Sequence, residues 1–165
     1  MRLVGIDPGV TGALAFIDTL DAVHTYVEDM PRDADGVDGG LVYRLLEMYE
    51  PAEVYLEKTQ AIPGKGTRAA FMQGDTNGSL RTAVHVLRVP LIWVQPAQWQ
   101  RQFSLYGGGF TDRERKDRSR ARAQELFPRL ADRLGLVKHH NRAEALLIAE
   151  YGRRTSITQA VVGGH

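Results

Sequence analysis

The first 18 residues constrain the fold most strongly, because two strand-like runs follow each other with almost no gap. Met1–Asp7 is apolar and leads into the turn sequence DPG, and Gly12–Asp18 reads GALAFID. Only Pro8–Thr11 connects the two runs. A connection this short joins antiparallel neighbours, because parallel strands need a crossover of about a dozen residues or more. The chain is therefore predicted to begin with a β-hairpin.

The remaining pattern extends this hairpin into a mixed sheet. Strands are predicted at Ala22–Glu28, Glu53–Lys58 and Pro90–Val94, and helices at Val37–Tyr49, Thr67–Leu87, Pro96–Phe103, Asp112–Phe127 and Asn141–Tyr151. Strand–helix–strand units favour parallel pairing. We expect an α/β fold with a mixed five-stranded sheet, three antiparallel strands followed by parallel ones, and helices on both faces. Residues 1–154 form one domain in this prediction, and residues 155–165 form a mobile tail.

Composition excludes several classes of protein. The chain has 165 residues, which suits one domain, and 43% of them are hydrophobic, as in an ordinary globular protein. It has no cysteine, so disulfides and thiolate chemistry are excluded. No apolar run approaches the roughly 18 residues that span a bilayer. We expect a cytoplasmic protein that has no membrane association and no small-molecule cofactor.

Three carboxylates occur on elements that should be buried. Asp7 ends the first strand, Glu57 lies at the end of the fourth, and Glu144 opens a nearly continuous apolar helix. A buried acid is costly unless it is paired or bound to a metal, and neighbouring carboxylates raise one another's pKa. Oxygen ligands of this kind suit Mg²⁺ or Mn²⁺. Each acid alone also has an ordinary structural explanation, such as a turn residue or a helix N-terminal charge.

Charge is distributed unevenly along the chain. Thr111–Arg122 contains six basic residues against three acidic ones, whereas Asp18–Asp38 is acidic. This asymmetry suggests a polyanionic partner, although a solvated helix face would look the same. A turn like GIDPG also occurs in sugar-kinase-like and actin-like ATPases, but those proteins need two such domains. The segment PGKGT lacks the spacing of a phosphate-binding P-loop.

Three motifs together resemble the RuvC-type Holliday junction resolvases. They read GIDPGVTGALAFID, VYLEKTQAIPGKG and HNRAEALLIAEYG, and the likeness covers residues 1 to about 154. The compact bacteriophage and prophage branch has the most similar motif order. The resemblance implies a ribonuclease H-like fold and a homodimeric, metal-dependent endonuclease that acts on four-way DNA junctions. It implies two Mg²⁺ or Mn²⁺ ions per active site, with Asp7, Glu57 and Glu144 as catalytic metal ligands.

The resemblance leaves the fourth ligand between two residues. His140 lies four residues and Asn141 three residues before Glu144, so both share its helix face. Imidazole is the better ligand for Mn²⁺, so we expect His140 to be the fourth catalytic ligand. His139 would then point away, toward the surface or a DNA phosphate. Since His140 replaces an expected carboxylate, a catalytically weak or inactive junction-binding protein remains an alternative, as does a ribonuclease H-like nuclease with another nucleic-acid substrate.

The resemblance also suggests which residues contact DNA and the second subunit. The DNA-binding candidates are basic or polar residues near the motifs, namely Lys58, Gln60, Lys65, Arg68, Arg113, Arg115, Lys116 and Arg118. The dimer surface is expected on the helix Thr67–Leu87, through Phe71, Met72, Leu80, Val84 and Leu87. These apolar residues could equally belong to the core.

Overall fold

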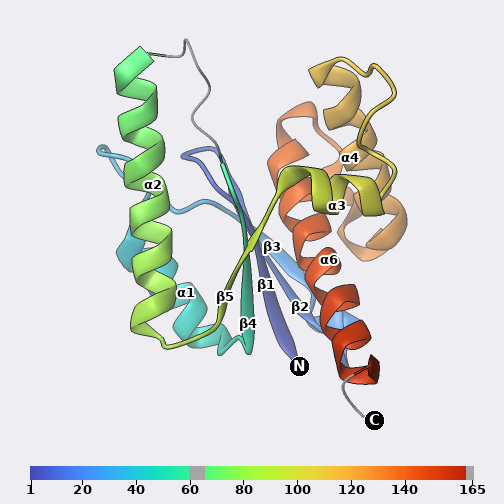
Figure 1. Cartoon of the computed structure of the whole chain (residues 1–165), viewed down its shortest axis with the longest axis horizontal. Coiled ribbons are helices and arrows are strands. Elements are labelled where there is room, and N and C mark those ends of the chain that lie inside the picture. Colours follow the sequence, from blue (N-terminus) through green and yellow to red (C-terminus); the bar gives the residue numbers. More distant parts are fainter. Residues whose placement is uncertain (60–65, 163–165) are drawn as a thin grey trace.

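The computed structural model describes residues 1–59 and 66–162, and it places a five-stranded sheet between two layers of helices (Figure 1). The strands are β1 (Arg2–Asp7), β2 (Ala13–Asp18), β3 (Tyr26–Asp29), β4 (Glu53–Glu57) and β5 (Leu91–Val94), in the spatial order β3-β2-β1-β4-β5. β1–β2 and β2–β3 are antiparallel, whereas β1–β4 and β4–β5 are parallel. The predicted mixed sheet is confirmed.

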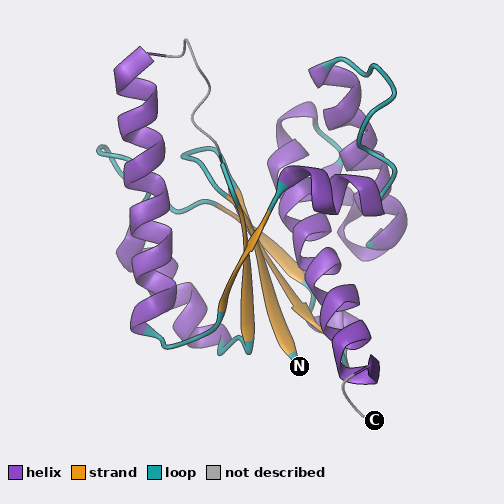
Figure 2. Ribbon diagram, viewed as in Figure 1, coloured by secondary structure: helices purple, strands orange, loops and turns teal. Residues whose placement is uncertain are grey.

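Helices cover both faces of the sheet, as expected (Figure 2). One face carries α1 (Gly39–Tyr49) and α2 (Gly66–Val86), and the other carries α3 (Pro96–Gln102), α4 (Asp112–Leu126) and α6 (His140–Val162). Short elements complete the chain: α5 (Ala131–Leu134) and the 3-10 turns η1 (Ala22–His24), η2 (Pro128–Leu130) and η3 (Val137–His139). Each face has its own apolar core, so the sheet is buried on both sides.

The central strand β1 divides its side chains between these two cores. Val4 and Ile6 pack toward α1 and α2, whereas Leu3 packs toward α6. Gly5 also faces α6, and a Cβ atom there would lie within 3.0 Å of backbone atoms of Ala145 and Ala149. The alternation of a strand thus places α6 directly against β1. Among the buried residues of β1, only the last one, Asp7, is charged, because Arg2 at the other end is exposed.

The last helix is longer than its apolar pattern predicted. The sequence predicted Asn141–Tyr151, but α6 continues to Val162 and includes residues assigned to a tail. Glu150 accepts hydrogen bonds from Arg153 (2.6 Å) and Arg154 (2.8 Å), one turn further on. Ser156 donates to Glu53 at 2.7 Å, which ties this part of the helix to β4. Polar contacts extend the helix where hydrophobic periodicity fades.

The predicted third strand, Ala22–Glu28, is wrong in its first half. The chain forms the turn η1 there, and β3 begins only at Tyr26. Asp21 accepts a hydrogen bond from the backbone N–H of Val23 at 2.8 Å, and its other oxygen lies 2.9 Å from His24 Nδ1. An aspartate that bonds to backbone two residues on favours a turn over a strand.

Helix α2 is continuous through Gly74 and Gly78, but most of its predicted dimer surface is core. Leu80 and Val84 are fully buried, and Leu87 packs against the same core. The predicted dimer surface is therefore wrong for the second half of the helix. In the first half, Phe71 is 72% exposed, so this part of the surface is open to a partner. Within the described ranges 1–59 and 66–162, none of the helices is both long and apolar enough to cross a bilayer.

Candidate active site

The three predicted carboxylates come to one end of the sheet. β1 and β4 are parallel neighbours, with Ile6 opposite Leu56, so Asp7 and Glu57 follow at the same edge. α6 packs across β1 and begins at this edge, which brings Glu144 to the other two acids. Asp7 is buried, and Glu57 and Glu144 are partly exposed. Three segments that are distant in sequence thus form one acidic cluster, which we call the carboxylate cluster (Asp7, Glu57 and Glu144).

The loop after Asp7 is held close to the strand. A Cβ atom on Gly12 would lie within 3.0 Å of the Asp7 carbonyl oxygen, so only glycine fits there. Gly9 has φ +137°, a conformation that favours glycine. The Asn141 side chain donates a hydrogen bond to the Thr11 carbonyl oxygen, which links the start of α6 to this loop. Asp7 therefore sits on a fixed backbone.

Burial and mutual repulsion weaken the acidity of the carboxylate cluster. The pKa of Asp7 is raised well above its usual value by burial first, and then by the charges of Glu144 and Glu57. Burial, followed by the charge of Glu57, raises the pKa of Glu144 to about 7. Burial also raises the pKa of Glu57, and the hydrogen bond from Trp99 opposes that effect. The cluster disfavours its own full ionisation, as an ion site without its cation does.

A lysine from α4 lies beside the cluster. Lys116 lowers the pKa of both Asp7 and Glu144, so its ammonium is near these acids. The same ammonium lies 3.1 Å from Asp112, one turn earlier on α4. Arg115 also lowers the pKa of Glu144, and its guanidinium lies 4.0 Å from Asp112. These two cations, predicted to bind DNA, therefore also act electrostatically on the carboxylate cluster.

The oxygen atoms of the carboxylate cluster suit a hard divalent cation, although the three side chains do not converge into a coordination shell. In residues 1–59 and 66–162, no three His, Asp or Glu side chains converge closely enough to hold a metal ion. The chemistry nevertheless matches: three carboxylates with raised pKa values offer oxygen ligands, and a cation would relieve their repulsion. Asp7, Glu57 and Glu144 are the residues that would hold Mg²⁺ or Mn²⁺.

This electrostatic strain predicts an unusual pH dependence of stability in the absence of metal. Between pH 4.5, the ordinary pKa of a glutamate, and about 7, Glu144 keeps its proton in the folded chain but loses it on unfolding. The free energy of unfolding should therefore fall as pH rises through this window. Thermal unfolding in EDTA should show a lower Tm at pH 8 than at pH 5.5, and Mg²⁺ should reduce the difference, because it binds the ionised cluster.

Glu144→Gln provides the matched variant for this prediction. The amide cannot ionise, so the fall of Tm between pH 5.5 and 8 should become shallower in EDTA. A wild-type Tm that stays constant or rises over this range in EDTA would contradict the assigned repulsion.

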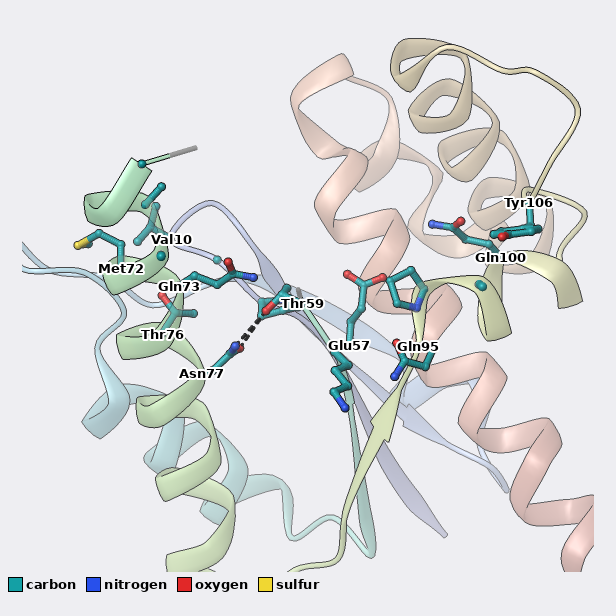
Figure 3. Close-up of a pocket in the computed structure, with 18 residues that line it drawn as sticks. Val10, Glu57, Thr59, Met72, Gln73, Thr76, Asn77, Gln95, Gln100 and Tyr106 are labelled. Atoms are coloured by element: carbon teal, nitrogen blue, oxygen red, sulfur yellow. Dashed lines mark hydrogen bonds between the residues drawn. The ribbon is translucent and has the colours of Figure 1, made fainter. Parts of the chain in front are cut away.

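A cleft of about 800 Å³ opens beside the cluster (Figure 3). Glu57 lies at its base, between α2 and α3 (Figure 3). Lys58 also lines the cleft, as do Pro8 and Gly9, which follow Asp7. Residues of α2 line one side, whereas Gln95, Gln100 and Tyr106 line the side formed by α3 and the loop after it. Thr59 and Asn77 hydrogen-bond across the base at 2.9 Å. Glu57 thus faces a cavity large enough for part of a DNA strand.

Of the two histidines, His139 does not lie where the sequence predicted. His139 is buried rather than on the surface, because η3 folds back and the Leu136 N–H donates to its Nδ1 at 3.3 Å. His140 is partly exposed, and its Nδ1 lies 3.1 Å from the Val137 carbonyl oxygen. Of the two candidates for the fourth ligand, Asn141 is the one whose side chain reaches the loop after Asp7. The role of His140 stays a prediction.

The predicted DNA-binding residues fall into two groups around the cleft. Lys58 lines it and is exposed, and Arg68 is exposed in the first turn of α2. Arg113, Arg115, Lys116 and Arg118 lie on α4, and the Arg118 guanidinium is 3.9 Å from the centre of the Phe110 ring. Gln60 and Lys65 lie outside the described residues.

Two aromatic residues at the site were not predicted. Trp99 is buried in the first turns of α3, and its indole N–H donates to Glu57 Oε1 at 2.8 Å. Tyr106 is 50% exposed at the cleft, with the Arg101 guanidinium 4.4 Å from the centre of its ring. Nothing in the local pattern of PAQWQ or LYGGG marks these contacts, because they depend on how α3 packs beside β4.

Solved structures with the same architecture bear on this geometry. No protein-family model matches the chain, and no curated protein matches it. RuvC from T. thermophilus in complex with a Holliday junction substrate is 18% identical, with a TM-score of 0.63 over 94% of this chain and 96% of that one. The chain has a RuvC-type resolvase fold. The expected ribonuclease H-like architecture is therefore confirmed.

Two further resolvases share this fold over nearly the whole chain. The fowlpox virus resolvase, solved with its substrate Holliday junction DNA, is 16% identical, with a TM-score of 0.57 over 95% of this chain and 99% of that one. The yeast mitochondrial Holliday junction resolvase Ydc2 is 13% identical, with a TM-score of 0.63 over 96% of this chain and 80% of that one. At these identities the likeness establishes the fold, and the chemistry must be argued from the site.

Proposed function

We propose that the chain is a metal-dependent endonuclease that resolves four-way or other branched DNA junctions. The carboxylate cluster carries this proposal: Asp7, Glu57 and Glu144 lie at one end of the sheet, weaken one another's acidity and adjoin a cleft. The junction substrates of two structural neighbours support branched DNA as the substrate. Mg²⁺ or Mn²⁺ is the cofactor that oxygen ligands of this kind favour, and the resemblance to the resolvases implies two ions per site.

The carboxylate cluster and nearby lysines would have different roles in phosphodiester hydrolysis. Asp7, Glu57 and Glu144 would hold the cations, which when bound would supply an activated water and a positive charge opposite the charge of the transition state. Lys58 offers a cation in the lining of the cleft, and Lys116 acts electrostatically on Asp7 and Glu144. Both are placed to attract a phosphate. The products expected of this chemistry carry a 3′-hydroxyl and a 5′-phosphate.

A panel of labelled substrates tests the proposal. A four-way junction, a linear duplex, a single strand and an RNA–DNA hybrid are incubated with the chain and Mg²⁺. We expect paired nicks in the junction, loss of cleavage in EDTA and little cleavage of the duplex. Preferred cleavage of the hybrid would indicate another substrate for the same site. Binding of the junction without any metal-dependent nick would instead favour a junction-binding protein.

Binding of the junction should weaken steeply with salt, because phosphate contacts release counterions. Exposed Arg113 on α4 is a candidate contact, so Arg113→Ala should reduce the slope of log affinity against log salt by about 1. Arg44→Ala, an exposed arginine on α1, is the matched control and should leave the slope unchanged. Fluorescence anisotropy with Asp7→Asn protein measures binding without cleavage, and equal slopes for both variants would contradict the assigned DNA path.

A homodimer remains part of the proposal, since symmetric cleavage of a junction needs two active sites related by a two-fold axis. The first half of α2 offers the available surface. Phe71 is exposed there, and an added Cβ atom on Gly74 would meet no atom within 4 Å. A neighbouring chain could therefore approach this part of α2 closely.

A further inference from the structure

We propose that Trp99 is a positioning residue that holds Glu57 in the orientation needed to bind a divalent cation. This inference rests on the proposed function, because it assigns a partner to one of its three carboxylates. The indole N–H of Trp99 donates to Glu57 Oε1 at 2.8 Å, a normal hydrogen-bond length. Oε1 is thereby oriented by the protein, and Oε2 is the oxygen that we assign to the cation.

The fold explains why Trp99 can act in this way. β4 and β5 are parallel, with Glu57 opposite Val94, and α3 begins two residues after Val94. Trp99 comes one turn into α3 and therefore returns to the end of β4. Only 1% of its surface is exposed, so its ring is fixed by packing and its one polar atom points at the carboxylate. A rigid donor of this kind sets the orientation of a ligand.

An indole suits this position better than a charged donor would. It satisfies one oxygen of a half-buried carboxylate without adding a positive charge that would compete with the cation. Lys116, by contrast, acts on Asp7 and Glu144, so the three acids have different kinds of partner. Loss of the indole N–H should loosen Glu57 and weaken cation binding, whereas the reaction at saturating cation should be less affected.

The primary test compares Trp99→Phe with Phe103→Leu. Phe103 follows α3, is 4% exposed and packs in the same core, so its truncation loosens this core without removing the hydrogen bond to Glu57; it also removes a contact with the Arg154 guanidinium, 5.0 Å from the ring centre. Calorimetric titration of the DNA-free proteins with MnCl₂ should show affinity lowered about 10-fold or more for Trp99→Phe, and much less for Phe103→Leu. Junction cleavage by Trp99→Phe should need correspondingly more Mn²⁺ and regain most of its rate at saturation.

A second variant separates the hydrogen bond from the shape of the ring. The other tryptophan of the chain, Trp93 on β5, is first replaced with phenylalanine, so that Trp99 is the one tryptophan left to exchange. Trp99 is then replaced with benzothienylalanine, which has sulfur in place of the indole N–H and nearly the same outline. We expect this protein to lose Mn²⁺ affinity as Trp99→Phe does, with a Tm close to that of Trp93→Phe.

The outcomes distinguish this inference from the proposed function. Unchanged or tighter Mn²⁺ binding by Trp99→Phe, or an equal loss in Phe103→Leu, would overturn the role of Trp99 while the nuclease proposal stands. Full Mn²⁺ affinity in the benzothienylalanine protein would overturn it as well. A wild-type chain that binds no Mn²⁺ and cuts no junction would overturn the proposed function, and the positioning role with it.

Discussion

Replacement of Asp7 with asparagine should abolish junction cleavage while the junction is still bound. Asp7 is the most buried member of the carboxylate cluster, and the charges of both other acids raise its pKa. The amide keeps the shape of the side chain but removes the charge that would hold a cation. Mutation of a residue that only supports a metal ligand typically lowers activity about 10- to 100-fold. For Asp7, which would itself be a ligand, we expect the cleavage rate to fall by more than about 100-fold.

The same variant should not unfold the protein. Asp7→Asn removes repulsion from Glu57 and Glu144, so its Tm in EDTA at pH 8 should equal or exceed that of the wild type. Asp35→Asn, an exposed aspartate in the loop before α1, is the matched control and should retain full cleavage. Gel-based cleavage and binding assays at one salt concentration measure both properties. If the Asp7→Asn protein still cleaves the junction, Asp7 is not a catalytic residue.

Replacement of Gly5 with alanine should destabilise the protein and damage the site together. The added Cβ would lie within 3.0 Å of the Ala149 backbone nitrogen and the Ala145 carbonyl oxygen, so α6 must move away from β1. Overpacking of a core costs about 1–3 kcal/mol, and rigid backbone atoms leave little room for relief. Because α6 carries Glu144, we expect a clear fall in Tm and weaker Mn²⁺ binding in the protein that remains folded.

Gly78→Ala tests whether the loss of stability comes from the close approach of α6 to Gly5 or would follow from replacing any glycine. Gly78 lies within α2, and a Cβ there would meet no atom within 4 Å. Alanine is favoured over glycine in a helix by up to about 1 kcal/mol, so this variant should be as stable as the wild type or more so. Equal Tm values for Gly5→Ala and the wild type, measured by calorimetry, would show that α6 is not packed against Gly5.

Much of the fold could be predicted from local sequence because its signals are local. The short connection Pro8–Thr11 dictates an antiparallel start, and apolar spacing defines α1 without knowledge of its neighbours. The carboxylate cluster was also predictable, since an acid on a buried element is costly in any fold. The local pattern failed where side-chain hydrogen bonds determine the backbone structure. The hydrogen bond to Asp21 favours the turn η1 over a strand, and those of Glu150 and Ser156 accompany the extension of α6.

The partners of the cluster could not be predicted in the same way. Trp99 follows Glu57 by 42 residues, and their contact depends on the register of β4 with β5 and on the start of α3. Lys116 was recognised as a cation, but its place beside Glu144 depends on the packing of α4 against α6. His139 was misplaced because its burial follows from the η3 turn and not from the spacing of the helix that comes after it.

The position of α6 in the chain has a consequence for biosynthesis. All five strands precede α6, yet α6 contributes Glu144 and covers the central strand at Gly5. A chain still emerging from the ribosome has two of the three acids and an uncovered face on its sheet. Nuclease activity of the proposed kind therefore cannot arise during translation of the strands. The activity depends on the docking of α6 against the sheet. Incomplete chains would therefore lack a complete active site and could not cut DNA.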